Sequence, residues 1–447
     1  MRKALLLSLL AVMVAGVPLA QDETEALRRD IVRFGTETEI AALLTALREE
    51  GEDLFDEDII AVANGTGNHS ILTVAFNFFG ERQVAGLEER AILAVEGRFD
   101  EHGESVLAAI DYLGRIGSRD AVLDLREVVE SGERRFLNNA IRALGRIGGA
   151  MGGEDASDMA EYLIEVHDGR DLDSNAVHEV ILALGATGAS EAVPFLSAIA
   201  LDALSTQFLR VTSLQALASI GDPDGLPAVL DAVSVSEPHV RAAAVEALGP
   251  FSGSEVDAAI LDAFRDSFER TRIAAALASR DRRLVSAVPY LRFRASRDES
   301  HAVREHSIRA LGAIGNAEAM ETVEELFLGR MNPVRIRIAA GEVLMEAAPE
   351  RHLEALVEEM DEARRRNFTA LYNGFLRILG TTTAGGMEEI TRRLLAESGV
   401  AERSTALDMA ANNNLAALAE EIRAIADGSN QGLANRARRT LDRMGLN

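Results

Sequence analysis

The stretch Leu113-Gly114-Arg115-Ile116-Gly117 recurs along this chain at nearly regular intervals. Its clearest further copies are Leu144-Gly145-Arg146-Ile147-Gly148, Leu184-Gly185-Ala186-Thr187-Gly188, Leu217-Ala218-Ser219-Ile220-Gly221 and Leu311-Gly312-Ala313-Ile314-Gly315. With weaker copies included, equivalent leucines lie 28 to 40 residues apart from Leu113 to Leu441. A period in the thirties is typical of stacked helical hairpins. The sequence therefore predicts an all-α fold, a right-handed α-solenoid of about eleven hairpins.

Each repeat reads as two helices. Apolar residues in 240–249 and 303–312 recur on one helical face and end at the leucine, which marks the first helix of a hairpin. The closing glycine is expected to end that helix, and the glycine beside the leucine is expected to let the next helix approach closely. Second helices begin at Val193-Pro194, Leu226-Pro227 and Val288-Pro289, because proline is tolerated in the first turn.

Val-Arg-x-x-Ala-x-x-Ala-Leu-Gly-x-Ile-Gly followed by a Val-Pro helix resembles HEAT repeats, in particular the short bacterial subtype named after phycobilin lyases. The resemblance covers roughly residues 100–447 and implies an armadillo-type fold. It implies no lyase activity, since a fold hosts many functions. An iron-dependent hydroxylase built of such repeats carries several His-Glu dyads. Here only His178-Glu179 has that order, and one dyad cannot hold a pair of metal ions.

Three regions are expected along the chain. Residues 1–20 read as a signal peptide, with Arg2 and Lys3 before an apolar run. Residues 21–100 read as degenerate N-terminal repeats or a cap, with helices near 40–47, 70–79 and 87–95. Residues 101–447 read as the repeat solenoid, ending in a half-repeat cap at 433–444. The 40-residue step between Leu144 and Leu184 predicts longer loops at 149–155 and 168–175, and 381–386 predicts a second flexible turn.

The composition limits the chemistry and the partners. The chain has no cysteine, which removes disulfides and thiolate catalysis. Its net charge is −26, which argues against binding nucleic acid or anionic membranes. The apolar run near the N-terminus is too short to span a bilayer, and no later segment is long enough, so no stable membrane insertion is expected. The sequence therefore predicts an exported protein located in the bacterial periplasm.

One segment departs from the acidic trend. Between 265 and 297, nine arginines face only three acidic residues, Asp266, Glu269 and Asp281. Arginine interleaved with aromatic residues is typical of protein-binding hot spots. The alternative is that these arginines pair with carboxylates of neighbouring repeats. The residues assigned here to partner binding are Arg265, Arg270, Arg272, Arg282, Arg283, Tyr290, Arg292, Arg294 and, from an equivalent second helix, Phe195.

Two smaller features of the sequence are candidate sites. Phe195 and Tyr290 each follow the proline of a second helix, where the ring is expected to lean toward the concave side or to pack partly against the next repeat. Asp171, Asp173 and Asn175 have the 1-3-5 spacing of a calcium loop, but the required glycine and the bidentate Glu are missing. A helix-capping role for that loop explains the pattern better, and no metal or cofactor is expected.

The function that these observations favour is an exported, non-enzymatic interaction scaffold. It would bind an unidentified protein or peptide on a concave face made by the second helices, near 265–297, and the arginines favour an acidic partner. Two alternatives stay open: an accessory or catalytic subunit that acts on an anionic envelope component through the arginine-rich band, and a structural spacer. No catalytic constellation is recognised in the sequence.

Overall fold

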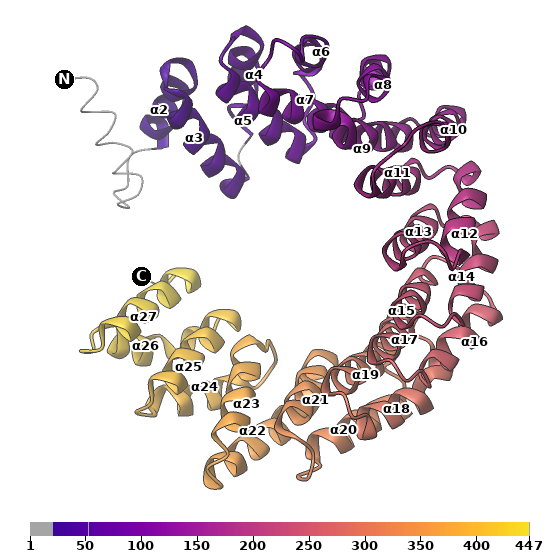
Figure 1. Ribbon diagram of the computed structural model, residues 1–447. Coiled ribbons are helices and arrows are strands. Elements are labelled where there is room, and N and C mark those ends of the chain that lie inside the picture. The colour runs from indigo at the N-terminus through magenta and orange to yellow at the C-terminus, as the bar shows by residue number, and fades with distance from the viewer. Residues whose placement is uncertain (1–20, 52, 447) are drawn as a thin grey trace. The chain divides into compact units, whose positions relative to one another are not determined.

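The computed structural model describes residues 21–51 and 53–446 (Figure 1). The predicted signal peptide, 1–20, lies outside these residues. The described chain consists of helices joined by short turns, and it contains no strand within those ranges. The fold class expected from the repeats, an α-solenoid, is confirmed. Two compact units make up the chain, unit 1 ending at Ala228 and unit 2 beginning at Val229.

The helices of unit 1 are α2 (Gln21–Phe34), α3 (Glu37–Glu50), α4 (Asp56–Gly65), α5 (His69–Arg82), α6 (Glu88–Glu96), α7 (Gly103–Ile116), α8 (Val122–Ser131), α9 (Arg134–Met151), α10 (Gly153–Gly169), α11 (Ser174–Thr187), α12 (Val193–Leu201) and α13 (Gln207–Ile220). Helix α14 (Leu226–Ala232) contains the boundary between the two units. The helices predicted near 40–47, 70–79 and 87–95 are confirmed as α3, α5 and α6.

The helices of unit 2 are α15 (Pro238–Ala247), α16 (Ser254–Ala263), α17 (Glu269–Asp281), α18 (Val288–Arg297), α19 (His301–Ile314), α20 (Ala317–Leu328), α21 (Val334–Ala347), α22 (Pro349–Arg365), α23 (Thr369–Thr381), α24 (Met387–Ala396), α25 (Val400–Asn412), α26 (Ala419–Ala426) and α27 (Gln431–Met444). Five even-numbered helices are preceded by a short 3-10 turn: η1 (Arg119–Ala121), η2 (Ser190–Ala192), η3 (Pro223–Gly225), η4 (Val285–Ala287) and η5 (Ala416–Leu418).

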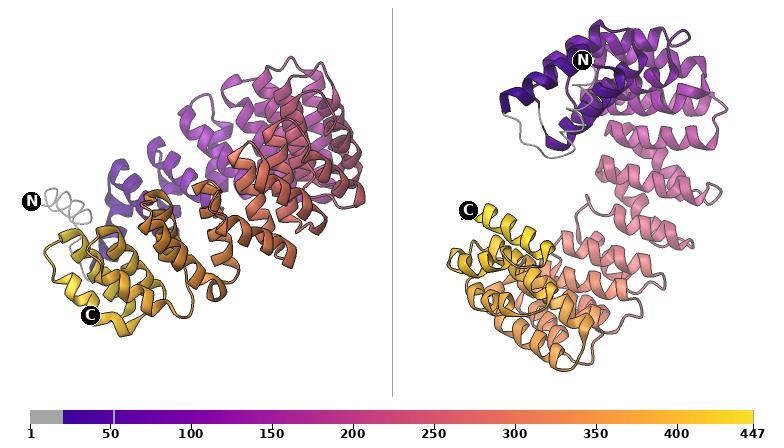
Figure 2. Two further views of the ribbon diagram at one scale, coloured as in Figure 1. Left: turned by 90° about the horizontal axis from the view of Figure 1, so that it is seen from below. Right: turned by 90° about the vertical axis from the view of Figure 1, so that its left-hand side faces the viewer.

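Within each unit the hairpins stack side by side and form two layers (Figures 1 and 2). The repeat leucines lie in or directly after the odd-numbered helices from α7 onward. Within each unit, neighbouring odd-numbered helices pack directly on one another, as α9 does on α11 and α17 on α19. Even-numbered helices of successive hairpins have fewer mutual contacts. The odd-numbered layer is thus the closely packed, inner side of each curved stack, and the even-numbered layer is the outer side (Figure 1).

The glycine beside the leucine acts as predicted. A Cβ atom at Gly145 would lie 2.5 Å from the Cα of Ala183 in α11, and one at Gly114 would lie 2.7 Å from the Cα of Ala143 in α9. Contacts that short do not occur between carbon atoms, so only glycine allows these helices to approach so closely. The neighbouring leucines, such as Leu144, are fully buried between the two layers.

The closing glycine ends the helix in four of the five clearest copies. Gly117, Gly188, Gly221 and Gly315 adopt the left-handed conformation with φ between 66° and 69°. In the fifth copy α9 continues through Gly148 to Met151, and Gly152, with φ 66°, follows it. The prediction for Gly148 was wrong because the helix continues past it, and a second glycine, four residues on, ends the helix with a positive φ and an extended ψ of −179°.

The longer loops predicted for the 40-residue step between Leu144 and Leu184 are not found. Its extra residues lengthen α9 to 18 residues and α10 to 17, and only 170–173 separate α10 from α11. The other predicted turn, at 381–386, is present between α23 and α24 and is hydrogen-bonded: Asn413 accepts from the N–H of Ala384 (3.0 Å) and donates to the carbonyl of Thr382 (3.0 Å).

Candidate functional site: the arginine-rich hairpin

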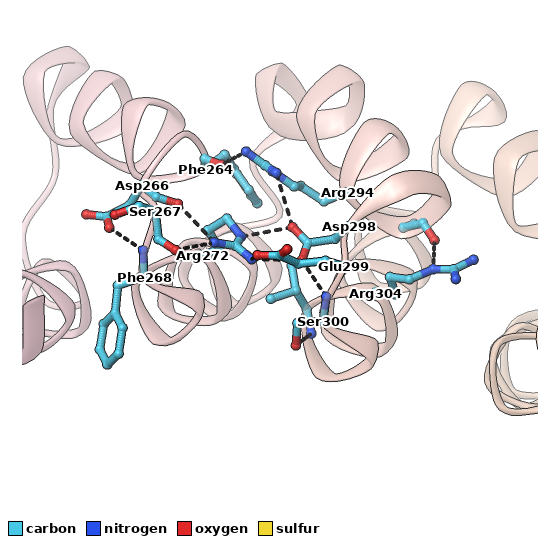
Figure 3. Close-up of polar contacts among 12 residues, drawn as sticks. Phe264, Asp266, Ser267, Phe268, Arg272, Arg294, Asp298, Glu299, Ser300 and Arg304 are labelled. Atoms are coloured by element: carbon cyan, nitrogen blue, oxygen red, sulfur yellow. Dashed lines mark hydrogen bonds and ion pairs between the residues drawn. The ribbon is translucent and has the colours of Figure 1, made fainter.

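Four odd-numbered helices of unit 2, α15, α17, α19 and α21, each hold a buried or partly buried arginine near their N-terminal ends: Arg241, Arg272, Arg304 and Arg337. Arg272, in α17, donates from Nε and Nη2 to the two carboxylate oxygens of Asp298, both at 2.8 Å (Figure 3). It also donates to the main-chain carbonyls of Asp266 (3.0 Å) and Ser267 (2.9 Å). One repeat earlier, Arg241 holds Asp266 in the same two-pronged way, at 2.7 and 3.0 Å. These pairs tie each hairpin of this region to the next.

Asp298 is the centre of this network. Its side chain is fully buried, and it also accepts from Arg294 (3.1 Å) and from the N–H of Ser300 (2.9 Å), as Figure 3 shows. Burial alone would raise the pKa of Asp298, but the hydrogen bonds from Arg272 and Ser300 outweigh it and hold the pKa below its ordinary value. The pKa of Asp266 is lowered against burial in the same way, by Arg241 and the N–H of Phe268. Both carboxylates stay ionised.

The partners of the equivalent arginines differ along unit 2. Arg304 occupies the next Val-Arg position, but its Nε donates to the carbonyl of Ala295 (2.9 Å), and burial lowers its pKa (Figure 3). Arg337 donates to the carbonyl of Phe327 (2.8 Å) and pairs with Glu359 (2.6 Å). Each of these arginines donates to a main-chain carbonyl in the segment that precedes its helix, and Arg241, Arg272 and Arg337 also pair with a carboxylate.

Five of the nine arginines in 265–297 have acidic partners. Arg272 is 3% exposed, so a partner protein cannot reach it, and its assignment to partner binding is wrong. Arg282 donates to the carbonyl of Phe251 (2.7 Å) and to Asp257 (2.9 Å). Arg294 donates to Asp298 and to the carbonyl of Phe264, while Arg265 pairs with Asp262 and Arg280 with Asp281. Pairing of arginines with neighbouring carboxylates therefore accounts for about half of the band.

The other four are exposed and have no carboxylate oxygen within 4 Å among the described residues: Arg270, Arg283, Arg292 and Arg297. Arg270 lies on the inner layer, in α17, near Glu246, whose pKa is raised by burial and lowered less strongly by Arg270. Arg283 follows α17 with a left-handed φ of 47°. Arg292 and Arg297 lie on α18, in the outer layer.

An exposed stripe runs along α18. Pro289, Arg292, Phe293 and Arg297, spaced i, i+3, i+4 and i+8, are all exposed, and Phe293 is 55% exposed. We call these four residues the α18 patch. Its opposite face, with Val288, Leu291 and Ala295, is buried in the core.

A depression of about 280 Å³ adjoins the α18 patch. It is lined by Phe264, Arg265, Pro289, Tyr290, Phe293 and Arg294. The rings of Phe264 and Tyr290 stack with centroids 5.8 Å apart, and the guanidinium of Arg265 lies 5.2 Å above Tyr290 and donates to its hydroxyl (3.2 Å). The guanidinium of Arg294 lies 5.5 Å from the ring of Phe293. The depression thus offers aromatic and aliphatic surface rimmed by positive charge.

The structure corrects the placement of Phe195 and Tyr290. Both lie on outer helices, α12 and α18, so the second helices do not form the concave face as expected (Figure 1). Phe195 packs edge-on against His167 of α10, with centroids 4.9 Å apart, and Tyr290 packs on Phe264, next to α16. Each ring packs against the preceding hairpin and is partly exposed.

The other candidate residues are engaged in packing or capping. Asp173 accepts from the N–H groups of Asn175 (3.0 Å) and Ala176 (2.9 Å), which makes it the N-cap of α11. The ring of His178 packs against Phe208, with centroids 4.3 Å apart and the rings tilted by 34°, and Glu179 pairs with Arg142. Within 21–51 and 53–446, no three His, Asp or Glu side chains are grouped as a metal ion would need.

Sequence reasoning missed a second cluster of arginines, on the inner layer of unit 1. Arg115 and Arg146 both donate to Asp111, at 2.7 and 2.8 Å, and so connect α7 with α9. The signal was present in the repeat itself, because these are the arginines of Leu-Gly-Arg-Ile-Gly in two successive copies. A side chain one residue after the packing glycine must lie beside its counterpart on the next helix.

The chain matches the family model described as Spirochaete HEAT repeat protein over residues 32–440. Among solved structures it is similar to Kap121p, with 10% identity over 94% of this chain and 53% of that chain and a TM-score of 0.48. It is also similar to importin beta, with 13% identity over 95% of this chain and 70% of that chain and a TM-score of 0.43. A third similar structure is human deoxyhypusine hydroxylase, with 18% identity over 61% of this chain and 96% of that chain and a TM-score of 0.25. The chain spans about half the length of Kap121p. No curated protein sequence matches it.

Proposed function

The chain belongs to the family of Spirochaete HEAT repeat proteins, and from that premise we propose that it is a protein-interaction scaffold. A stack of hairpins exposes a long surface on which each repeat adds a few side chains at regular spacing. Among the described helices none is long and apolar enough to cross a membrane. We further propose that residues 1–20 direct export, and that the scaffold acts in the periplasm.

The contact surface that we propose is the α18 patch with its adjoining depression. The observation that supports it is electrostatic. In a chain of net charge −26, Arg292 and Arg297 are exposed beside Phe293 and have no carboxylate partner within the described residues. Exposed arginines next to a large exposed aromatic ring combine charge-assisted hydrogen bonding with apolar burial, the two features that concentrate binding energy in hot spots.

The partner's chemistry follows from these groups. Guanidinium groups bind carboxylates in a two-pronged geometry, and the 280 Å³ depression accommodates one apolar or aromatic side chain. We therefore expect an acidic protein segment that carries an apolar residue. Because the net charge of the chain repels an acidic partner over long distances, binding should rely on short-range contacts with the arginines, which salt screens less than it screens the long-range repulsion.

A peptide titration tests this proposal. A fluorescein-labelled peptide of Glu and Asp residues around one Phe is titrated with the full chain, and anisotropy gives the Kd. We expect Arg292→Glu with Arg297→Glu to weaken binding at least tenfold, about 1.4 kcal/mol. Arg282 is left unchanged, because it holds Asp257 and the carbonyl of Phe251.

The matched control changes the same charge elsewhere. Arg134 and Arg439 are exposed and, among the described residues, lie in no ion pair, so Arg134→Glu with Arg439→Glu alters the net charge equally. This control should keep the Kd within about twofold. Equal weakening by both double variants would mean that only net charge matters, which contradicts a site at the α18 patch. An anionic polysaccharide such as heparin that competes better than the peptide would favour an anionic envelope component as the ligand.

A further inference from the structure

Two depressions on the inner layer of unit 1 meet in one groove. The first, of about 370 Å³, lies across α5, α7 and α9, and the second, of about 830 Å³, extends across the C-terminal ends of α5, α7 and α11 and the last turns of α9. Arg115 and Arg146 line both. We call this surface the α5–α11 groove. It lies in unit 1 and in the odd-numbered layer, so it is separate from the α18 patch.

The charges that line the groove are balanced, with three arginines, Arg115, Arg142 and Arg146, and three acids, Glu81, Glu104 and Asp111. The single carboxylate of Asp111 accepts from Arg115 and Arg146, and Glu179 holds Arg142 at 2.9 and 2.5 Å. The side chains of Arg115, Arg142 and Arg146 are 35% to 37% exposed. A guanidinium has five N–H donors, so each has donors left for a ligand. This balance contrasts with the acidity of the whole chain, and it disfavours a strongly charged ligand.

Free amide groups lie beside these arginines. Asn77 of α5 and Asn139 of α9 line the 370 Å³ depression, and neither side chain has a hydrogen-bond partner among the described residues. A side-chain amide has one acceptor and two donors, which matches the carbonyl and N–H of one peptide unit. The described lining residues of the groove include no aromatic ring, so a nucleobase or another ring that needs stacking finds no platform.

We propose that the α5–α11 groove binds an extended polypeptide through its main chain. Asn77 and Asn139 pair with peptide units, and Arg115, Arg142 and Arg146 donate to carbonyl oxygens. Helices pack about 9 Å apart, so the groove across four inner helices is roughly 27 Å long. At about 3.3 Å per residue it accommodates about eight residues. Specificity for side chains is low, because the groups that line the groove address the main chain.

A peptide selection provides the probe. A phage-displayed library of random 12-residue peptides is selected on the full chain, and an enriched sequence is synthesised with a fluorescent label. We expect neutral, extended sequences, a tenfold or greater loss of affinity on Asn77→Ala with Asn139→Ala, and a similar loss when alternate main-chain nitrogens are methylated. Methylation removes N–H donors and leaves the side chains unchanged, so it reports main-chain recognition.

The control removes two other exposed amides of unit 1, by Asn175→Ala with Gln207→Ala. Neither residue lines the groove, and this variant should bind the peptide with unchanged affinity. The Arg292→Glu, Arg297→Glu variant should also bind normally, so the two proposed surfaces can fail independently. If the full chain retains no more phage of the library than its Asn77→Ala, Asn139→Ala variant does, the proposal is overturned. Equal loss in both amide variants, or indifference to N-methylation, would also overturn it. So would enrichment of acidic sequences only, with binding that depends on Arg292 and Arg297.

Discussion

At the scale of single residues, an arginine's sequence neighbours do not reveal its partner. The count of charges in 265–297 omitted Asp257, Asp262, Asp298 and Glu299, which lie just outside that window. All four form ion pairs with arginines inside it: Asp257 with Arg282, Asp262 with Arg265, and Asp298 and Glu299 with Arg272. Only the stacking of hairpins brings residues 25 or 26 positions apart together, so the excess of arginines overstated the charge that is free for a partner.

The buried pair of Arg272 and Asp298 makes a prediction about stability. Asp298→Ala removes one member and leaves the guanidinium buried without its carboxylate, which costs about 3–5 kcal/mol of the free energy of unfolding. Asp281→Ala removes an acid whose ion pair with Arg280 is largely exposed. This variant should change the free energy of unfolding by less than about 0.5 kcal/mol. Urea unfolding followed by circular dichroism measures both. Equal stability of the two variants would show that the buried pair does not stabilise the hairpin.

The lowered pKa of Asp298 predicts a dependence on pH. A carboxyl whose pKa is lower in the folded state than its ordinary 3.8 contributes stability above that pH, and the contribution disappears as the pH falls through the folded pKa. The free energy of unfolding of the natural chain should thus fall more steeply below about pH 5 than that of Asp298→Asn. Parallel curves for the two proteins between pH 5 and pH 3 would contradict this assignment.

At the scale of elements, the repeat predicted the hairpins well because its residues act locally. A leucine, a packing glycine and a closing glycine each have one geometric task. One prediction failed because another residue can end the same helix, as Gly152 does in place of Gly148. A second failed because the extra residues of the 40-residue step lengthen α9 and α10 and do not form a loop. The layer that faces inward was also assigned wrongly, since either helix of a hairpin has an apolar face.

The close approach of α9 and α11 leads to a test at this scale. Gly145→Ala places a methyl group against the Cα of Ala183 and should lower the free energy of unfolding by about 1–3 kcal/mol, although alanine is the better helix former. Gly432→Ala, in α27, places the methyl group 3.4 Å from the nearest side-chain atom and should be neutral or slightly stabilising. Thermal unfolding of the two variants separates packing from helix propensity, and a stabilised Gly145→Ala would refute the packing role.

At the scale of the whole molecule, the sequence indicated a solenoid but could not indicate which surfaces stay free. Arg272, Arg282 and Arg294 of the band bond to neighbouring hairpins or to the loops between them. Of the four exposed arginines without a carboxylate partner among the described residues, two, Arg292 and Arg297, lie on α18. The inner groove of unit 1 was hidden because its asparagines and arginines are separated by whole repeats. Function therefore has to be sought in the side chains that the packing leaves unpaired.

Photocrosslinking at the α18 patch tests the central claim, an interaction scaffold, most directly. Phe293 is replaced by benzoylphenylalanine, and Phe368, 51% exposed in the same unit, is replaced in a control. In cells of the native host we expect position 293 to crosslink to a defined protein through an acidic segment, and Arg292→Glu with Arg297→Glu to abolish the product. Identical products from both positions, or a product that survives the charge reversal, would contradict the account.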